Sequence, residues 1–600
     1  MGSGCYLSRQ KPMDQIHSIL THIKYPVEYD NNSSYYKRIS TKLLKTHDND
    51  KNIVDYNQIL LTLNIRLMTQ DLSTSYRNQL ILNLLKQFNL NDEKIKYFQQ
   101  ILQDKIQLSL KKTSIFQFNQ IKLSDYFMCP IKIYSLKINE YQGGICLSIE
   151  LHHSYFNILV ITFLLLISSS TLSPYTIKET FLLPEYLRNQ FSKNLCQYIA
   201  EKLDEFCKKK SIEQTYKKII PLGLSYSIPC LQNTIFNAYT YEQLTKDEQE
   251  IGIRSILQDA INETNSHIKL LIIINETMAT LIFCHHSTND CQMAITIGDG
   301  TNICYYDKLT STDIDNNHET IINTEWTLFN DGDDKTTNSL ELIVTKFDKY
   351  VNDLYSKQQN EKFRYFSQFV QDNSLAELLR LILLDFYHRR LLFDHDPIKA
   401  ITVIEQLHPL TRQNIITAKD LNDISSDYYS QFQHIRRILT RINLDYSSTT
   451  DCIILQLICN LILKRASKLC AAAFATIINK QKIKNITIAL GGRLIRENKK
   501  FRNHFLYYLR EYVTKDIAYK TIMLDNVSGI GTAILTMIHQ QMFIINDEQR
   551  ILKEKKLVTT NKAKNSIESK INIPVLIKSR QAEKCQRRQS ILKIHSSISS

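Results

Sequence analysis

The residues best suited to chemistry follow the end of one apolar run. Residues 270–274 are apolar without exception, and 275–277 add an amide, a carboxylate and a hydroxyl. This order is typical of a buried strand that presents polar groups at the carboxyl edge of an α/β sheet. Two short strand-like runs follow, and the second, 293–297, ends at the glycine-rich segment 298–302. We therefore predict that the functional site is built around residues 270–302.

Length and composition limit the class of protein. Six hundred residues with 43% hydrophobic content are too many for one core and predict two or more domains. The thirteen cysteines form no C-x-x-C pair, and the first residues contain no apolar signal segment, which indicates a cytoplasmic protein with reduced thiols. The most apolar run, 158–167, is about half as long as a membrane-spanning helix, so we expect a buried strand and no transmembrane segment.

The two ends of the chain differ from its middle. Residues 1–55 are polar and lack periodicity, which predicts an extended arm. The basic tail, 544–600, is predicted to be disordered, and its lack of interleaved aromatic residues argues against a nucleic-acid partner. Weak membrane association is a further hypothesis. It would use acylation of Gly2 and Cys5, or the basic tail, although Tyr6 stands where the acylation motif requires Ser or Thr.

Periodicity predicts alternating helices and strands around the central stretch. The expected elements are helices over 76–110 with a break at 89–92, strands near 131, over 145–151 and over 158–166, a helix through 195–206, an apolar turn over 221–230, a helix opened by a Ser374/Glu377 capping box, a helix over 453–478, a strand over 486–490 and a strand-to-helix transition over 525–533. The pattern indicates an α/β protein.

Six short segments resemble motifs of the hexokinase family, in that family's order, over about residues 60–543. They are LGLSYSIPCLQ at 222–232 (LGFTFSFPCxQ in the family), NET at 275–277 (NDT), GDGTNICY at 298–305 (GTGTNACY), INTEW at 322–326 (INTEW), KRASKLC at 464–470 (RRAAxLC) and SGIGTA at 528–533 (SGKGAA). The number of motifs and their order make this resemblance far more specific than any one glycine pattern.

The resemblance implies an actin-like ATPase (ribonuclease H-like) α/β fold, with two lobes around a central cleft that closes on hexose and MgATP. Residues 56–250 would form the N-terminal, small-lobe region. Residues 251–543 would form the C-terminal, large-lobe region, whose last part returns toward the small lobe. The implied reaction is transfer of the ATP γ-phosphoryl group to the hexose 6-hydroxyl, which requires a carboxylate that accepts the hydroxyl proton.

The family's functional residues carry over to matching positions. Glu276 corresponds to the catalytic base. The hexose-binding positions are Ser227, Thr245, Lys246, Asn275, Asn302 and Glu325, of which Thr245 and Lys246 match only after a one-residue insertion. The nucleotide-binding positions are Gly298, Asp299, Gly300, Thr301, Ser528, Gly529 and Gly531. No residue is assigned as a direct metal ligand.

The catalytic position departs from the family pattern. Glu276 stands where the family has aspartate. The two carboxylates have similar intrinsic pKa values, about 4.3 and 3.9. The extra methylene moves the carboxylate by roughly 1–1.5 Å, and a misplacement on that scale can lower the rate about a hundredfold. A second family glutamate falls at Ser367, which removes a long hydrogen-bond acceptor.

The phosphate-binding positions depart further. Residues 150–157 align with the family's first phosphate loop, but His152 and His153 replace its two glycines and Asn157 replaces its arginine. Asp299, Val527 and Ile530 replace a threonine, a glycine and a basic residue of the family pattern, respectively. Two repairs are conceivable: protonated histidines could supply charge, and Glu150 with Asp299 could hold Mg²⁺ through water. ATP and Mg²⁺ are therefore the doubtful ligands of this chain.

Two hypotheses follow, and the sequence leaves open whether the chain is an enzyme. In the first, it is an ATP-dependent hexose kinase for a glucose-like sugar, and the altered site makes it slow or silent. In the second, it is a non-catalytic sensor or scaffold that binds a hexose with the same fold. The hexose-binding positions depart less from the family pattern than the nucleotide-binding ones.

Overall fold

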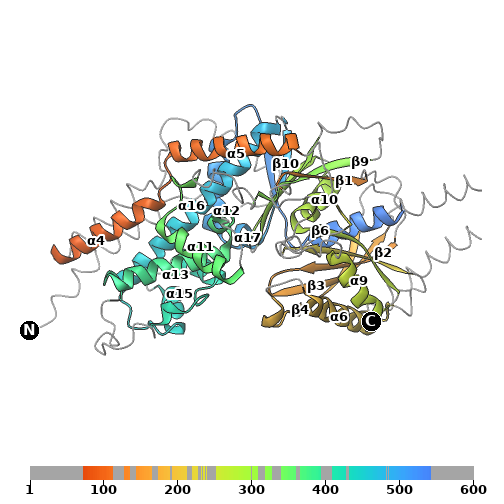
Figure 1. The fold of residues 1–600 in the computed structure, drawn as a ribbon, viewed down its shortest axis with the longest axis horizontal. Coiled ribbons are helices and arrows are strands. Elements are labelled where there is room, and N and C mark those ends of the chain that lie inside the picture. The colour runs from red at the N-terminus through yellow and green to blue at the C-terminus, as the bar shows by residue number, and fades with distance from the viewer. Residues whose placement is uncertain are drawn as a thin grey trace, which may run out of the picture. The chain divides into compact units, whose positions relative to one another are not determined.

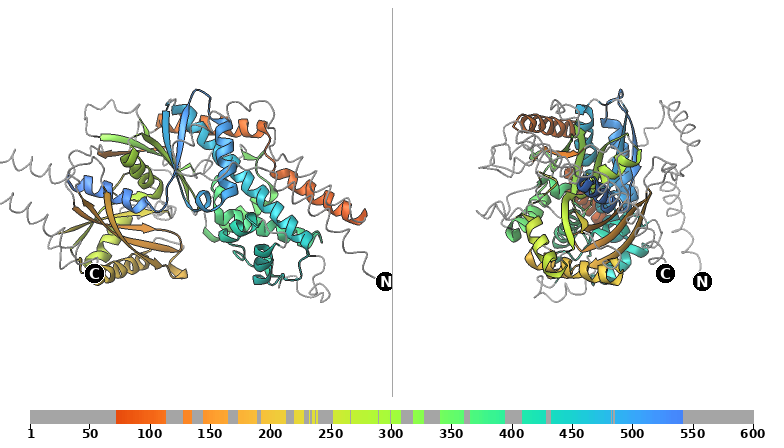
Figure 2. Two further views of the ribbon diagram at one scale, coloured as in Figure 1. Left: turned by 180° about the vertical axis from the view of Figure 1, so that it is seen from behind. Right: turned by 90° about the vertical axis from the view of Figure 1, so that its right-hand side faces the viewer.

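The computed structural model describes most of the chain between residues 72 and 541. The described residues are 72–112, 127–134, 144–164, 173–188, 192–212, 219–227, 232, 234–236, 238, 252–265, 267–288, 290–298, 300–307, 318–326, 340–359, 365–393, 408–427, 432–481, 483 and 485–541. The predicted N-terminal arm with Gly2 and Cys5, and the predicted tail, lie outside them. The chain divides into two compact units (Figures 1 and 2).

The first unit is drawn from residues 1–89, 382–415 and 423–461, and its described elements are helical. They are α4 (Leu72–Leu85), η1 (Lys86–Phe88), η9 (Pro409–Thr411), α15 (Gln433–Arg441) and parts of α13 (Asp372–His388), α14 (Ala418–Ser425) and α16 (Thr449–Gln481). Side chains that accept hydrogen bonds from backbone N–H groups hold its turns in place. Asp451, for example, accepts hydrogen bonds from the backbone N–H groups of Ser448 (2.9 Å) and Phe393 (3.3 Å).

The second unit contains both sheets. The five-stranded sheet has the order β4-β3-β2-β5-β6 and consists of β2 (Gly144–Leu151), β3 (Tyr155–Leu164), β4 (Ser173–Leu182), β5 (Ile220–Tyr226) and β6 (Ile268–Asn275). The six-stranded sheet has the order β1-β9-β8-β7-β10-β11 and consists of β1 (Cys129–Tyr134), β7 (Cys291–Ile297), β8 (Thr301–Asp307), β9 (His318–Asn323), β10 (Asn485–Gly491) and β11 (Ala518–Met523).

Helices make up the rest of the described elements of the second unit. They include α5 (Asp92–Lys112), η4 (Glu185–Leu187), α6 (Lys193–Lys209), α9 (Ile253–Thr264), α10 (Glu276–Thr288), α11 (Lys346–Gln359), α12 (Tyr365–Val370), α17 (Arg493–Glu497), α18 (Lys499–Tyr512) and a helix over 528–541. Buried residues of α6 and α9 share one hydrophobic cluster with β2, β3, β5 and β6. Buried residues of α10 and the 528–541 helix share a second cluster with strands of both sheets, so these two helices lie between the sheets.

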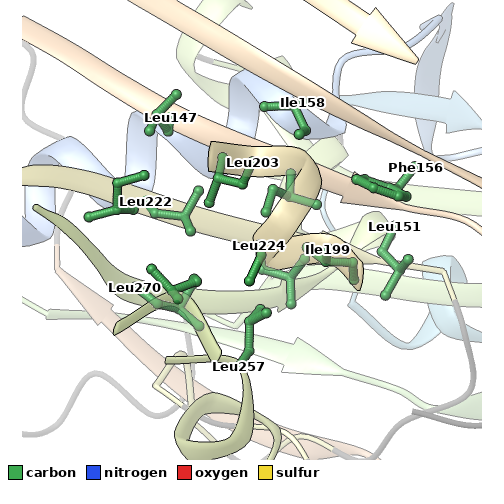
Figure 3. Close-up of a cluster of buried hydrophobic side chains, with 14 of the residues drawn as sticks. Leu147, Leu151, Phe156, Ile158, Ile199, Leu203, Leu222, Leu224, Leu257 and Leu270 are labelled. Atoms are coloured by element: carbon green, nitrogen blue, oxygen red, sulfur yellow. The ribbon is translucent and has the colours of Figure 1, made fainter. Parts of the chain in front are cut away.

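Alternation along β2 explains this layering. Leu147 and Leu151 point to the α6 side and pack with Ile199 and Leu203 of that helix (Figure 3). Cys146 belongs to the cluster on the opposite face. Every residue of β2 and β5 is buried, as expected for parallel strands covered by helices on both sides. The unit therefore has the α/β architecture that the sequence pattern predicts.

Most elements agree with the sequence-based prediction, and three do not. The first strand-like run after 275 is wrong, because that segment is helix α10. The predicted turn over 221–230 is wrong in its first part, because β5 is extended to Tyr226. The capping box is wrong as well: α13 begins at Asp372, and Glu377 binds Arg380 (2.6 Å) within the helix. Short apolar runs do not distinguish helix from strand, which explains the first two differences.

Strands from both predicted sequence regions occur in both sheets. β1, from 56–250, pairs with β9, and β6, from 251–543, pairs with β5. The boundary at residue 250 remains a prediction. Within the described residues, no helix combines the length and apolarity that crossing a membrane requires.

A buried ion pair connects α11 with α16 inside the second unit. Arg465 donates to both carboxylate oxygens of Asp348 (2.9 and 2.8 Å) and to the carbonyl oxygen of Ile343 (2.9 Å). Its guanidinium also lies over the ring of Phe369, 4.7 Å from the centroid. Both charged side chains are 3% exposed, so neither can exchange its partner for water. The KRASKLC motif therefore has a structural role through its arginine.

We predict that Arg465→Met destabilises the protein by about 3–5 kcal/mol, because it leaves the Asp348 carboxylate buried without its cation. The measurement is the midpoint of urea denaturation followed by circular dichroism. Lys208→Met is the control, since Lys208 pairs with Asp204 at the surface and is 67% exposed. An Arg465→Met midpoint equal to that of the control would contradict the structural role of the pair.

Candidate functional site

Three parallel strands end together at one edge of the five-stranded sheet. β5 pairs in parallel with both β2 and β6, and the register places Leu151, Tyr226 and Asn275 side by side. Adjacent strands lie about 4.8 Å apart. The residues that follow the first two strands are His152 and Ser227. This edge is the carboxyl edge where α/β sheets commonly carry their polar sites.

Ser227 is held against β2. Its N–H and its hydroxyl both donate to the carbonyl oxygen of Leu151 (2.9 and 3.2 Å), and its Oγ lies 3.4 Å from Nδ1 of His152. The His152 ring stacks on Tyr155 with ring centroids 4.5 Å apart. The other ring nitrogen of His152, Nε2, is buried and has no hydrogen-bond partner among the described residues. A histidine at this glycine position thus joins the polar edge of the sheet.

Asn275 has a fixed orientation and one unused donor. Its Oδ1 accepts from the N–H of Met278 (2.8 Å) at the start of α10, and its own N–H donates to Oε1 of Gln232 (3.2 Å). The bond from the Met278 N–H determines which side of the side-chain amide is oxygen and which is nitrogen. In the part of the chain that the structure describes, the buried Nδ2 has no partner. An unpaired buried N–H₂ group is energetically costly unless a ligand accepts from it.

Asn302, Asn323 and Glu325 form a hydrogen-bonded network at the ends of β8 and β9. Nδ2 of Asn302 donates to Oδ1 of Asn323 (2.7 Å) and to Oε1 of Glu325 (3.4 Å). Nδ2 of Asn323 donates to the same Glu325 oxygen (2.9 Å). Glu325 has a left-handed backbone with φ of 40°, a conformation that is uncommon outside glycine. All three side chains are buried, so the network is preorganised.

A cysteine connects this network with Asn275. Sγ of Cys304 lies 3.8 Å from Oδ1 of Asn275 and 3.6 Å from Oδ1 of Asn323. Burial and the nearby Glu325 carboxylate raise the pKa of the Cys304 thiol well above its usual range. The thiol therefore stays protonated and donates a weak hydrogen bond. Asn275, Asn302, Asn323 and Glu325 form one contiguous polar cluster.

The structure brings together four of the six predicted hexose positions: Ser227, Asn275, Asn302 and Glu325. Thr245 and Lys246 lie outside the described residues. Sequence reasoning missed Asn323 as a site residue, although it lies within the INTEW segment at 322–326. It missed Cys304 in the same way, inside the 298–305 segment. Both residues lie inside segments that resemble family motifs, and that is the signal that could have identified them. Glu276 is half-buried and begins α10 directly after Asn275.

The glycines of the 298–302 segment lie close to protein backbone. A Cβ at Gly300 would lie 2.7 Å from the carbonyl oxygen of Ser227, and one at Gly298 would lie 2.8 Å from the amide nitrogen of Arg493. Larger residues at these positions would displace the loop from its neighbours. Thr301 begins β8, and its buried hydroxyl has no partner among the described residues. Asp299 itself lies outside the described residues.

In the segment 150–157, which aligns with the family's first phosphate loop, the carboxylate of Glu150 accepts hydrogen bonds from the groups around it. Oε1 of Glu150 accepts from the hydroxyl of Ser528 (2.9 Å) and from the N–H of Gly529 (2.7 Å), where the 528–541 helix begins. Oε2 accepts from Nδ2 of Asn157 (2.8 Å) and from Nζ of Lys178 (3.3 Å). Ser528 and Gly529 thus bind Glu150, and Glu150 has no lone pair left for a hydrated ion.

The contacts of Glu150 therefore do not fit the water-mediated Mg²⁺ site predicted for Glu150 and Asp299. Glu150, one half of the predicted water-mediated pair, is consumed by protein donors, and no group of three potential metal ligands occurs among the described residues. His153 is exposed, and Ile530 packs against the hydrophobic cluster of α10. Gly531 lies directly against the Ala279 carbonyl of α10, so its missing side chain serves helix packing.

Comparison with known proteins places this geometry in a family. Two family models described as hexokinase match residues 80–286 and 292–538. The chain is 28% identical to mouse Hexokinase-1 over 373 residues, which are 60% of this chain and 36% of that protein. It is 25% identical to a hexokinase of Brugia malayi over 371 residues, 59% of this chain and 61% of that protein. The chain thus spans about a third of the length of Hexokinase-1.

Among solved structures, a Schistosoma mansoni hexokinase complexed with glucose aligns with a TM-score of 0.63 at 21% identity, over 76% of this chain and 98% of that one. A second hexokinase structure aligns with a TM-score of 0.56 at 15% identity. The fold is that of the hexokinases, which confirms the predicted actin-like ATPase class. Fold and family models agree, and the chain belongs to the hexokinase family.

Proposed function

We propose that this chain binds a glucose-like hexose at the cluster of Asn275, Asn302, Asn323 and Glu325, and that it phosphorylates the 6-hydroxyl slowly or not at all. The observation that carries the proposal is the buried, preorganised network of Asn302, Asn323 and Glu325 beside the unpaired amide of Asn275. Family membership supports hexose phosphorylation in general.

Hexose recognition suits the chemistry of this cluster. A sugar hydroxyl both donates and accepts, so it can accept from Nδ2 of Asn275 and donate to a carboxylate oxygen of Glu325. A charged acceptor forms stronger hydrogen bonds than a neutral one, especially away from water. The existing bonds of Asn302 and Asn323 hold the Glu325 carboxylate in place before a ligand arrives, which reduces the entropy lost on binding.

Glu276 is the group that would accept the 6-hydroxyl proton. It follows Asn275 at the same edge of the sheet, and its backbone belongs to α10, which is packed between the two sheets. Its backbone position is therefore well defined. Its side chain is one methylene longer than the aspartate of the family, which supports slow turnover.

A second candidate function is hexose binding without turnover. The specific observation in its favour is that Glu150 accepts hydrogen bonds from the hydroxyl of Ser528 and the N–H of Gly529. These two residues are predicted to hold the nucleotide. A protein of this kind would signal hexose concentration through a change in its structure or its partners. The two candidates share the hexose site and differ only in the phosphate side.

We predict that hexose changes the fluorescence of Trp326, the only tryptophan of the chain. It follows Glu325 directly, and its ring is buried with an edge-to-face contact to Phe366 (5.2 Å). A glucose titration should give a saturable change that Asn302→Ala abolishes, because the Glu325 carboxylate loses a donor. Asn262→Ala on the exposed side of α9 is the control. A flat titration of folded wild-type protein would refute the hexose site.

We predict that Glu276→Ala lowers hexose 6-phosphate formation by about 100- to 10,000-fold, the usual contribution of a general base. Glu276→Asp should raise the rate by up to about 100-fold, because it returns the carboxylate to the family's geometry. A coupled assay for sugar phosphate with MgATP measures both, with Glu263→Ala on α9 as control. Turnover that survives Glu276→Ala would contradict the assigned role. No turnover in any variant, with a normal hexose titration, would support the second candidate.

A further inference from the structure

Donors from three separate segments converge on the carboxylate of Glu150. They are the Ser528 hydroxyl and the Gly529 N–H at the start of the 528–541 helix, Nδ2 of Asn157 on β3, and Nζ of Lys178 on β4. Glu150 is 1% exposed, so these are its partners in place of water. A set of one cation, one amide and a helix start is what proteins use to bind an anion such as phosphate.

The groups around the Glu150 carboxyl favour its ionised form. Burial raises the pKa of the Glu150 carboxyl, but Lys178, the Gly529 N–H, His152 and Asn157 together outweigh burial and bring the pKa below its ordinary value of 4.5. Asn157 cannot rotate freely, because its Oδ1 accepts from the hydroxyl of Thr180 (2.8 Å). The Asn157 donor is therefore fixed toward the carboxylate.

The carboxylate also fills the space beside the helix start. An added Cβ at Gly529 would lie only 3.0 Å from Cγ and Oε1 of Glu150. A phosphate oxygen that approached the Gly529 N–H would meet this carboxylate at van der Waals contact. Two like charges about 4 Å apart repel by about 1 kcal/mol in water and by several-fold more away from water. Phosphate and Glu150 cannot share these donors.

We propose that Glu150 is an internal anion that occupies the phosphate-binding position at the start of the 528–541 helix and thereby excludes nucleotide phosphate from Ser528 and Gly529. The identification of the excluded ligand as a nucleotide rests on the proposed function. The anion position itself rests only on the contacts of Glu150. Glu150 is thus a specificity-determining residue: it separates hexose binding, which it leaves intact, from phosphate binding, which it opposes.

The test removes the internal anion and offers an external one. In Glu150→Ala, the four donors remain without an acceptor, so we expect a site for inorganic phosphate and for ADP without Mg²⁺. Calorimetric titration should show binding at least tenfold tighter than in wild type, and the melting temperature should rise with phosphate concentration. Glu179→Ala is the matched control, because Glu179 lies beside Lys178 on β4 and pairs with Lys209 near the surface. It should behave as wild type does.

Several results would overturn the proposal. Equal phosphate affinity in folded Glu150→Ala and wild type would show that no anion position exists. ADP binding that is tight in wild type and lost in the variant would show that Glu150 serves the nucleotide. Should Glu150→Ala fail to fold without additives, folding restored by phosphate supports the proposal, and Glu150→Gln, with the shape but not the charge, must then bind phosphate more tightly than wild type. The Trp326 titration with hexose, repeated in each variant, tests the proposed hexose site separately.

We also predict that Glu150 contributes to stability in a pH-dependent way. Because the pKa is lower in the folded than in the unfolded state, this contribution is complete above pH 4.5 and is lost as the pH falls through the folded-state pKa. The groups that affect this titration are Lys178 and His152. The difference in the free energy of unfolding between wild type and Glu150→Gln should therefore be largest near neutral pH and shrink in acid. A difference that is constant from pH 7 to pH 3 would contradict the lowered pKa.

Discussion

The parallel pairing of β2, β5 and β6 is the constraint on which the site depends. Its register sets Leu151, Tyr226 and Asn275 in one row, so the residues that follow meet at one edge of the sheet. A one-residue shift in any of these strands would turn its side chains to the other face. Complete burial of β2 and β5 makes such a shift costly, because apolar side chains cover both faces. The core thus fixes the positions of the polar groups.

The two halves of the site have diverged in different ways. At the proposed hexose positions, Asn302 and Glu325 bind one another, and Nδ2 of Asn275 has no partner among the described residues. On the phosphate side, the expected donors bind Glu150. The difference follows from residue type. The amides of Asn302 and Asn323 both donate and accept, so they can form hydrogen bonds with one another and with a sugar. The buried Glu150 carboxylate only accepts, and its burial is favourable only when nearby donors bind it.

Much of the fold, and the grouping of part of the candidate site, could be predicted from the sequence. The strands around 270–274 and 293–297 were predictable because these five-residue runs end sharply at a polar residue or a glycine. Helix α10 was not, because its buried face and its neighbours make it apolar on all sides, which hides the helical period. Motifs located Asn302 and Glu325. The motifs could not reveal the hydrogen bond between Glu150 and Ser528. These two residues are 378 positions apart, and only the folded chain brings them together.

The close contact of Gly531 with Ala279 has a practical consequence for the length of the polypeptide. The 528–541 helix supports α10, the helix that begins with Glu276, and it also supplies two of the four donors to the Glu150 carboxylate. A polypeptide that stopped after β11 would still encode every predicted hexose position, yet it would expose the apolar face of α10 and leave Oε1 of Glu150 without its two donors. A recombinant fragment therefore has to include the 528–541 helix to keep α10 and Glu150 in their observed surroundings.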